Sequence, residues 1–325
     1  MVSDQGRKHE LVRRFLLESE WVGAPLNVEF LAAGEYNENY LVKADDELAV
    51  FRINHGTQLG IGDQISYEFE VLRTVEPSGV TPAPLRLCRS HRDFPNGALL
   101  MRYLPGRPLD YRHDAEGAAK CLARIHSLPY DAASGPLIVQ ADPIADIIAE
   151  CLGLLDRYSD HPLPEKGRRI RAYMEHVRRL ATRSSFAAER LRVVNTEVNS
   201  GNFLVDGTRV RLVDWEKAVA SYRYQDLGHF LVPTTTLWKT DFTFSPDERR
   251  RFLAVYHELA RPPVSRDELD ERTQLLEETI LLRAFSWVYM AYAEYASGSR
   301  ALANEGTFAT ITHYLDHVDE FLGTA

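Results

Sequence analysis

The sequence has 325 residues and a formal net charge of −9, a length that suits one globular unit or two closely packed lobes. The acidic balance argues against a nucleic-acid partner, and no apolar run approaches the roughly 20 residues that a membrane-spanning helix needs. The polar N-terminus has no apolar signal segment, and the widely spaced Cys88, Cys121 and Cys151 form no CxxC pair. We therefore expect a soluble, cytoplasmic protein with buried, reduced thiols, without a membrane partner, a zinc site or a disulfide framework.

The first third of the chain alternates short apolar runs with turn signals, which is typical of a strand-rich lobe. Between the runs, residues 64–75 carry apolar side chains at helical spacing and stop before a Pro-Ser-Gly turn. Four segments have the composition of strands: residues 27–32, 39–44, 49–53 and 98–103.

The Pro-Gly-Arg-Pro segment at residues 105–108 interrupts this pattern, and helical signals dominate most of the remaining chain. One β-like island, residues 191–219, lies among the predicted helices. A strand-rich N-terminal lobe (1–103) and a mainly helical C-terminal lobe (104–325) predict a two-lobed α+β fold. The helices are expected at residues 115–126, 246–259, 273–296 and 309–322.

The β island contains the residues that indicate chemistry. Residues 195–205 read N-T-E-V-N-S-G-N-F-L-V, and residues 212–216 read L-V-D-W-E. Glu197 precedes Asn202 by five residues, and Asp214 follows it by twelve. Two apolar runs flank an Asp-Gly turn, so we expect a hairpin that brings Asn202 and Asp214 to the same end of neighbouring strands. Oxygen ligands for magnesium beside a carboxylate that accepts a hydroxyl proton are the groups that phosphoryl transfer requires.

These loops resemble the catalytic and metal-binding loops of choline/ethanolamine kinases and aminoglycoside phosphotransferases, which read H-x-D-x-x-x-x-N and then I-D-W/F-E. Residues 221–230 (S-Y-R-Y-Q-D-L-G-H-F) are similar to the next stretch of choline kinases, so that branch is the nearest. The resemblance implies a protein-kinase-like fold with ATP and Mg²⁺ as cofactors. It also implies that Asn202 and Asp214 bind magnesium and that Asp226 braces the catalytic loop from behind.

The chain departs from this family pattern at two positions. Asn195 stands where the family has His, and Glu197 stands where it has the catalytic Asp. Because Glu is only one methylene longer, Glu197 can accept the proton after a small backbone shift, and it is the predicted catalytic residue. A general base contributes about 10²–10⁴-fold, so a misplaced base would slow the chemistry without abolishing nucleotide binding.

The N-terminal lobe supplies the predicted nucleotide site. Residues 34–42 (G-E-Y-N-E-N-Y-L-V) resemble the turn that covers the phosphates in the family, and glycine and asparagine there tolerate left-handed backbone angles. The resemblance further implies that Arg52, on an apolar strand, pairs with the phosphates and that Glu68, on the next helix, is its partner. The predicted nucleotide contacts of the turn are Gly34, Asn37 and Asn39.

A hinge for the nucleotide base is expected at the end of this lobe. Residues 97–106 resemble the family segment L-M-x-Y-L-P-G, and residues 81–85 resemble its x-P-x-P-x turn. By this resemblance, adenine would stack between apolar side chains and bond the backbone near Met101, Arg102 and Leu104. The resemblance covers approximately residues 30–230, and its specificity comes from the order and spacing of the motifs.

The acceptor side is less defined by the sequence. The segment 285–295 carries aromatic residues at helical spacing, which suits an ammonium group through cation–π contact but is also typical of an ordinary helix core. His126 and His229 are interpreted as packed scaffold residues. The candidate substrate contacts are Glu216, Trp238, Trp287 and Tyr292.

Three functions agree with these patterns. The first is an ATP-dependent phosphotransferase acting on a hydroxyl of a small molecule, for which an amine-bearing compound is one candidate. The second is an aminoglycoside-modifying kinase, which would need a wide acidic cleft. The third, motivated by Asn195 and Glu197, is a nucleotide-binding protein of kinase fold with reduced or lost catalysis. The choice between ATP and GTP and the oligomeric state stay open.

Overall fold

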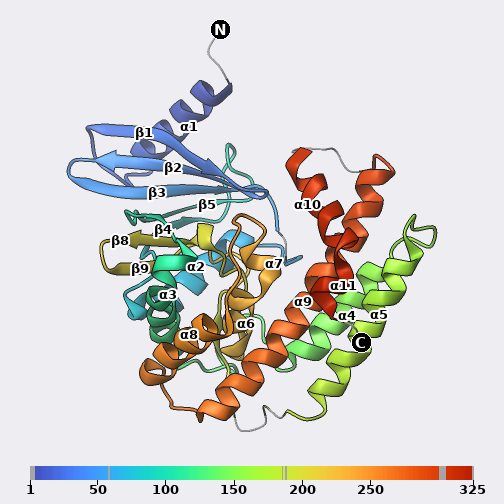
Figure 1. Cartoon of the computed structure of the whole chain (residues 1–325). Coiled ribbons are helices and arrows are strands. Elements are labelled where there is room, and N and C mark those ends of the chain that lie inside the picture. Colours follow the sequence, from blue (N-terminus) through green and yellow to red (C-terminus); the bar gives the residue numbers. More distant parts are fainter. Residues whose placement is uncertain (1–3, 58, 185, 187–188, 300–304, 324–325) are drawn as a thin grey trace.

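The computed structural model describes residues 4–57, 59–184, 186, 189–299 and 305–323. It has two lobes, an antiparallel sheet with flanking helices above a larger helical body (Figure 1). The predicted two-lobed α+β fold is therefore confirmed. The boundary between residues 103 and 104 stays a prediction.

The N-terminal lobe is built on a five-stranded sheet in the order β1, β2, β3, β5, β4, with every neighbouring pair antiparallel. All four predicted strands are present, but β4 was expected only as a turn. Because proline lacks an N–H, it suits the start of an edge strand, and β4 begins with Pro84 at the sheet edge. The strands are β1 (Leu26–Ala33), β2 (Asn37–Ala44), β3 (Glu47–Asn54), β4 (Pro84–Cys88) and β5 (Ala98–Arg102).

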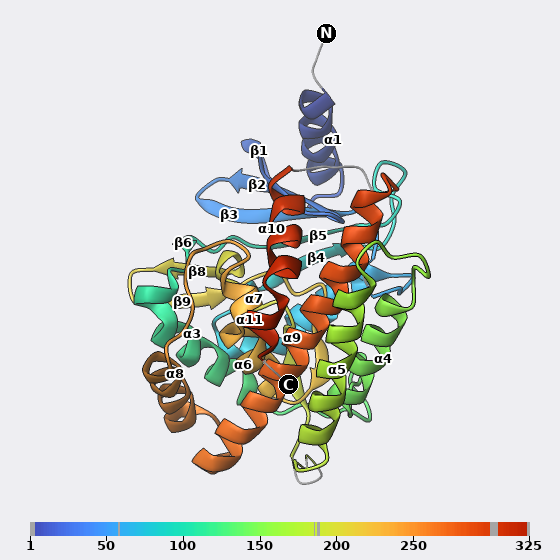
Figure 2. The same cartoon turned by 45° about the vertical axis from the view of Figure 1, so that its right-hand side comes forward.

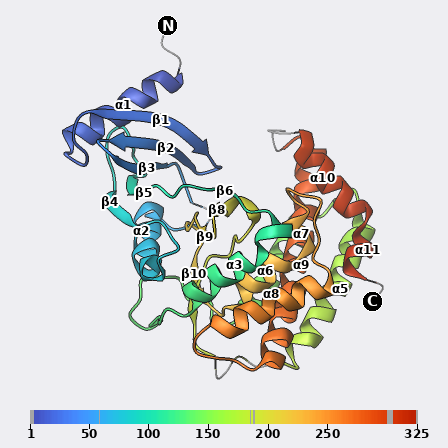
Figure 3. The same ribbon diagram turned by 60° about the vertical axis from the view of Figure 1, so that its left-hand side comes forward.

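The two faces of this sheet are covered differently. Helix α1 (Asp4–Glu18), which the sequence analysis did not predict, packs on the face away from the helical lobe (Figure 3). Phe15 of α1 contacts Phe51 there, with ring centroids 5.7 Å apart. Helix α2 (Gln64–Val75) has its predicted bounds, because the Asp63 side chain caps Ser66 N at 3.1 Å and a turn with Gly79 at φ 70° ends it.

The chain crosses between the lobes through residues 103–106 and then forms the short strand β6 (Arg107–Pro108), which pairs with β8 of the β island. Gly106 has φ 150°, and a Cβ at this position would lie 2.9 Å from Val205 N. Only glycine therefore permits the two backbones to approach so closely.

The β island positions the predicted chemical residues. Strands β8 (Phe203–Asp206) and β9 (Arg209–Leu212) form the predicted hairpin, which the 3₁₀ turn η2 (Ser200–Asn202) precedes. A second ladder joins β7 (Arg192–Val194) to β10 (Val219–Ser221). The two ladders therefore fix both ends of residues 195–202, which carry Glu197, and of residues 213–218, which carry Asp214.

The helical lobe is organised around α9 (Arg266–Ala296), which α4, α5, α6, α8 and α10 contact (Figure 2). This helix begins seven residues before the expected Thr273, because Ser265 and Glu268 form a capping box. The last predicted helix is divided at His317. The remaining helices are α3 (Tyr111–His126), α4 (Pro143–Leu155), α5 (Pro164–Ala181), α6 (Tyr224–Leu231), α7 (Pro233–Thr236), α8 (Pro246–Leu259), α10 (Glu305–Asp316) and α11 (Val318–Leu322).

The three cysteines differ in their burial. Cys121 and Cys151 are buried as predicted, whereas Cys88 is partly exposed at the edge strand, and all three are free thiols. Within the described ranges, none of the helices combines the length and apolar character needed to cross a membrane.

Candidate active site

Arg52 on β3 lies at the junction of the two lobes. It is only 6% exposed, and its Nη1 contacts Glu68 Oε1 of α2 at 2.5 Å and Asp214 Oδ1 at 3.1 Å. Its Nε donates to Asn39 Oδ1 at 2.9 Å. Burial opposes the charge of Arg52, but Glu68 and Asp214 together outweigh burial and raise the pKa of the guanidinium above its usual value. Arg52 thus stays charged and joins three elements that are far apart in the sequence.

The predicted phosphate-covering turn joins β1 to β2 and also reaches the helical lobe. Gly34 N donates to Asn37 O at 2.8 Å, which closes the turn. The side chain of Asn37 donates to the Glu216 carboxylate and accepts from Asn54 Nδ2 at 3.0 Å. The turn is therefore anchored through Asn37 to the strand end that carries the acidic residues.

The β8–β9 hairpin places Asn202 and Asp214 as the sequence predicted. Phe203 pairs with Leu212, and Val213 N donates to Asn202 O at 2.8 Å, so both residues lie at the same end of the hairpin. The Nδ2 of Asn202 donates to Glu197 O at 2.9 Å. The amide oxygen is consequently the atom that Asn202 can offer to a cation.

Three carboxylates gather at this end of the hairpin. Oxygen atoms of Glu197, Asp214 and Glu216 all lie within 4.8 Å of one another. Burial, followed by the negative charges of Asp214 and Glu68, raises the pKa of Glu216 to about 7. This crowding of hard oxygen donors and negative charge fits a divalent cation such as Mg²⁺. Glu216, predicted as a substrate contact, thus lies with the candidate metal ligands.

The loop that carries Glu197 is held from behind by the buried Asp226. The Asp226 carboxylate accepts from Asn195 N and Thr196 N, both at 2.8 Å, and contacts His126 Nε2 at 3.1 Å. Burial lowers the pKa of His126 despite the neighbouring carboxylate, so this histidine is a neutral packed residue as expected. The geometry agrees with the bracing role that the resemblance implies for Asp226.

Asn195, which replaces the family histidine, has a structural function in this loop. Its Nδ2 donates to Asp214 O at 2.7 Å, and its Oδ1 accepts from Glu197 N at 3.0 Å. Thr196 and Asp214 have positive φ angles of 67° and 64°. Such conformations are strained for residues with side chains and concentrate at functional sites. Asn195 therefore couples the Glu197 loop to the segment that carries Asp214.

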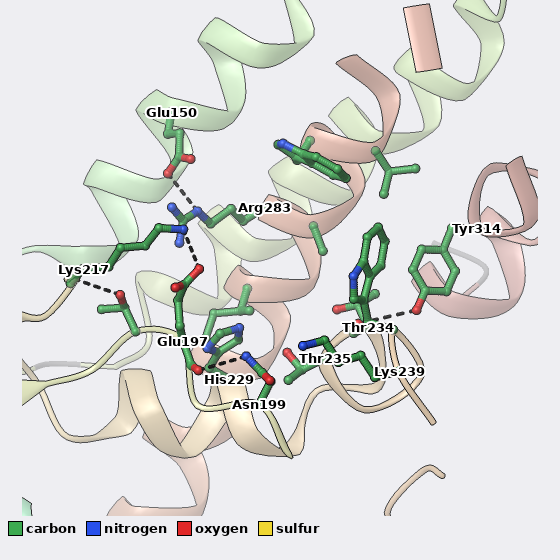
Figure 4. Close-up of a pocket in the computed structure, with 16 residues that line it drawn as sticks. Glu150, Glu197, Asn199, Lys217, His229, Thr234, Thr235, Lys239, Arg283 and Tyr314 are labelled. Carbon is green, nitrogen blue, oxygen red and sulfur yellow. Dashed lines mark hydrogen bonds and ion pairs between the residues drawn. The ribbon is translucent and has the colours of Figure 1, made fainter. Parts of the chain in front are cut away.

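Glu197 has a partner that the sequence analysis missed. The Nζ of Lys217 contacts Glu197 Oε1 at 2.5 Å (Figure 4). Lys217 directly follows the D-W-E segment, and this position next to the predicted metal loop was the available signal, because Glu197 lies 20 residues away in the sequence. The contact gives the longer Glu197 side chain a defined position.

Two backbone N–H groups of the predicted hinge already donate hydrogen bonds to neighbouring parts of the N-terminal lobe. Arg102 N donates to Ala83 O at 2.8 Å, and Tyr103 N donates to Leu48 O at 3.2 Å. Among the residues that the structure describes, Leu104 N has no backbone partner. The buried Met101 lies on β5 beside Val50. Leu104 N is therefore the hinge donor that the backbone leaves available, and the contact with adenine stays a prediction.

A cavity of about 440 Å³ lies beside Glu197 (Figure 4). Trp238 and Trp287 line it with an edge-to-face contact, their ring centroids 5.8 Å apart. The candidate contact Tyr292 does not line this cavity and stacks on Phe308 at 5.6 Å instead. This difference follows from helix geometry, because five residues along α9 rotate Tyr292 about 140° away from Trp287.

Comparisons with solved structures agree with this architecture. An ethanolamine kinase from Plasmodium vivax is 12% identical, with a TM-score of 0.66, and the match covers 94% of this chain and 88% of that one. A choline/ethanolamine kinase family protein from Mesorhizobium loti is 17% identical, with a TM-score of 0.63 and coverage of 97% and 96%. Spectinomycin phosphotransferase in complex with ADP and spectinomycin is 12% identical, with a TM-score of 0.59 and coverage of 90% and 89%. At these identities the likeness shows the shared fold alone.

The sequence itself identifies the family. No curated protein matches the chain significantly. The model of the phosphotransferase enzyme family (APH) matches residues 27–271, from β1 into α9. Since this match spans most of the chain and includes both lobes, the protein belongs to the phosphotransferase enzyme family.

Proposed function

We propose that the protein is an ATP- and magnesium-dependent phosphotransferase that acts on a hydroxyl of a small molecule. The observation that carries this proposal is the grouping of the Glu197, Asp214 and Glu216 carboxylates within 4.8 Å, next to the buried Arg52. A site that combines hard oxygen donors with a fixed cation suits a nucleotide triphosphate and its metal ion.

In this proposal the two lobes supply different groups. Arg52, with the turn at residues 34–39, would contact the phosphates, and the hinge near Leu104 would contact the base. Asn202, Asp214 and Glu216 would hold magnesium, whose charge would offset that of the phosphates. The ADP bound to spectinomycin phosphotransferase supports an adenine nucleotide as the donor.

Glu197 is the proposed base. In the proposed reaction the acceptor oxygen forms a bond to the γ-phosphorus, the bond from that phosphorus to the β–γ bridging oxygen breaks, and ADP leaves. The hydroxyl proton passes to Glu197. Glu197 lines the cavity that can receive the acceptor, and Lys217 holds its carboxylate at 2.5 Å. This arrangement favours a working enzyme over the alternative of a kinase fold that only binds nucleotide.

Calorimetric titration of ATP with and without Mg²⁺ tests the proposal. The parent should bind ATP more tightly with Mg²⁺, and Asp214→Asn should lose most of this gain, at least about tenfold, because a neutral amide is a weaker metal ligand. Asp46→Asn, at an exposed turn of the N-terminal lobe, is the matched control.

Two results would contradict the proposal. Identical ATP titrations of the parent with and without Mg²⁺ would remove the metal assignment. ATP binding without ADP release, over a broad panel of hydroxyl compounds, would favour the nucleotide-binding alternative.

A further inference from the structure

The cavity beside Glu197 is where an acceptor hydroxyl could meet the proposed base. Residues of the Glu197 loop, of helices α4, α6, α7, α9 and α10, and of the segment that carries Lys217 surround it. Only the placement of the acceptor in this cavity rests on the proposed function. The charges of the lining then indicate which chemical class of acceptor fits.

The carboxylates of this lining are already paired. Glu197 contacts Lys217 at 2.5 Å, and Glu150 Oε2 contacts Arg283 Nε at 2.9 Å (Figure 4). These are the two acidic residues of the described lining. An ammonium group in the cavity would therefore have to compete with Lys217 or Arg283 for its counter-charge.

Lys239 is the remaining charged residue. It lines the cavity and has no hydrogen bond or ion pair to any residue in the described part of the chain. A Cβ added to Gly201 would lie 3.1 Å from Lys239 Nζ, so the ammonium group lies directly against the Glu197 loop. Figure 4 shows Lys239 reaching toward Asn199, on the side of Glu197 opposite Lys217. Lys239 is exposed, and among the charged residues of the described lining it is the one without a charged partner.

His229 adds a neutral polar group to the same cavity. Its Nδ1 is buried and lacks a hydrogen-bond partner among the described residues. Burial, with the nearby charges of Arg283 and Lys217, lowers the pKa of His229 to about 4, so the ring is neutral near pH 7. A buried polar atom without a partner is unfavourable unless a ligand or water satisfies it.

The opposite wall is aromatic. Trp238 contacts Trp287 edge to face, and the ring centroids of Trp238 and Tyr314 lie 6.1 Å apart. All three residues line the cavity. This wall can cover the apolar body of a ligand whose polar groups face the Glu197 loop.

From this distribution we propose that the acceptor carries a carboxylate or another small oxyanion in addition to its hydroxyl, and that Lys239 binds this anion. The apolar body of the acceptor lies against Trp238 and Trp287. This acceptor differs from the amine-bearing compound that the resemblance to choline kinases suggests, and from an aminoglycoside. The physical reason is that both carboxylates of the described lining, Glu150 and Glu197, are already paired.

Three benzyl alcohols that differ only in the para substituent provide the test: one has a carboxylate, one an aminomethyl group and one a hydroxymethyl group. Each is titrated calorimetrically without nucleotide, so the outcome does not depend on kinase activity. The parent should bind the carboxylate at least about tenfold more tightly than the other two, as expected for a charge-assisted contact.

Substitutions of Lys239 assign this preference to its charge. Lys239→Met should remove the preference, Lys239→Arg should keep it, and Lys239→Glu should favour the aminomethyl compound. Lys120→Met, at an exposed position of α3, is the matched control and should behave like the parent.

Four results would overturn the inference: no measurable binding of the carboxylate, equal binding of the three alcohols, a preference for the amine in the parent, or a preference that survives Lys239→Met. A loss of ATP affinity in Lys239→Met, with the preference intact, would place Lys239 at the nucleotide. ADP release is measured separately. An anion preference that depends on Lys239, with no ADP release over the broad panel of hydroxyl compounds, would support the anion site while contradicting the proposed function.

Discussion

Replacement of Arg52 by Met should destabilise the protein strongly. The substitution keeps an unbranched side chain on β3 but removes the charge that pairs with Glu68, which is only 1% exposed. Removing one partner of a buried ion pair costs about 3–5 kcal/mol, because the other charge is left uncompensated. The Arg52 contact with Asp214 would be lost as well, so we expect a loss of free energy of unfolding near the upper part of that range.

Urea denaturation with matched variants measures this effect. The double variant Arg52→Met, Glu68→Gln should recover at least about 1 kcal/mol relative to Arg52→Met, because the stranded negative charge is gone. Arg73→Met is the control, since the Arg73–Glu70 pair on the same helix is exposed, and it should change stability by less than about 0.5 kcal/mol.

Nucleotide titrations separate the structural role of Arg52 from the proposed functional one. Arg52→Met should weaken ATP more than adenosine, because only ATP carries the phosphates. Equal weakening of both ligands would assign Arg52 to structure alone. A loss of stability no larger than that of Arg73→Met would refute the reasoning about the buried pair.

The site supports three further predictions. Glu197→Gln should lower turnover of an accepted hydroxyl compound by about 10²-fold or more with ATP affinity unchanged, and an equal rate of ADP release would exclude Glu197 as the base. Lys217→Met should lower kcat roughly tenfold with the KM for ATP unchanged, and Lys217→Arg should restore it; an unchanged kcat would show that the contact does not position Glu197. The pKa of His229 is about 4 in the folded protein and 6.5 in the unfolded chain, so the unfolded state binds the proton first as the pH falls. The contribution of His229 to stability is thus complete above pH 6.5, falls by about 2 kcal/mol at pH 5, and is lost toward pH 4. His229→Gln should remove this part of the pH dependence in urea denaturation, and identical pH profiles of parent and variant would refute it.

Much of the fold follows from local sequence patterns. Four of the five strands of the N-terminal lobe, helix α2 and the β8–β9 hairpin were predicted, because apolar periodicity and turn residues act over a few neighbouring positions. Helix α1 was missed because its apolar residues alternate with many charged ones, and among its described side chains only Val12, Phe15 and Leu16 are buried. Its stability comes mainly from packing on the sheet, which a local pattern does not contain.

The order and spacing of motifs also determined where the candidate site lies. The hairpin brings Asn202 and Asp214 together by local pairing alone, so their proximity was predictable. The early start of α9 was visible in principle, since Ser265 and Glu268 have capping-box spacing. The family, likewise, was identified from motif order before the model match to residues 27–271 confirmed it.

The tertiary structure alone decided which charges meet. Three features depend on how loops from different parts of the chain pack. They are the pairing of Lys217 with Glu197, the position of Glu216 among the candidate metal ligands, and the placement of the unpaired Lys239 against Gly201. Tyr292 shares an aromatic helix with Trp287, yet it faces another neighbour because the helix turns it away from the cavity. Residue types and spacings specify what a side chain can do, but the charge of the acceptor that we propose depends on the sum of charges around one cavity. That sum exists only after elements distant in the sequence have packed together.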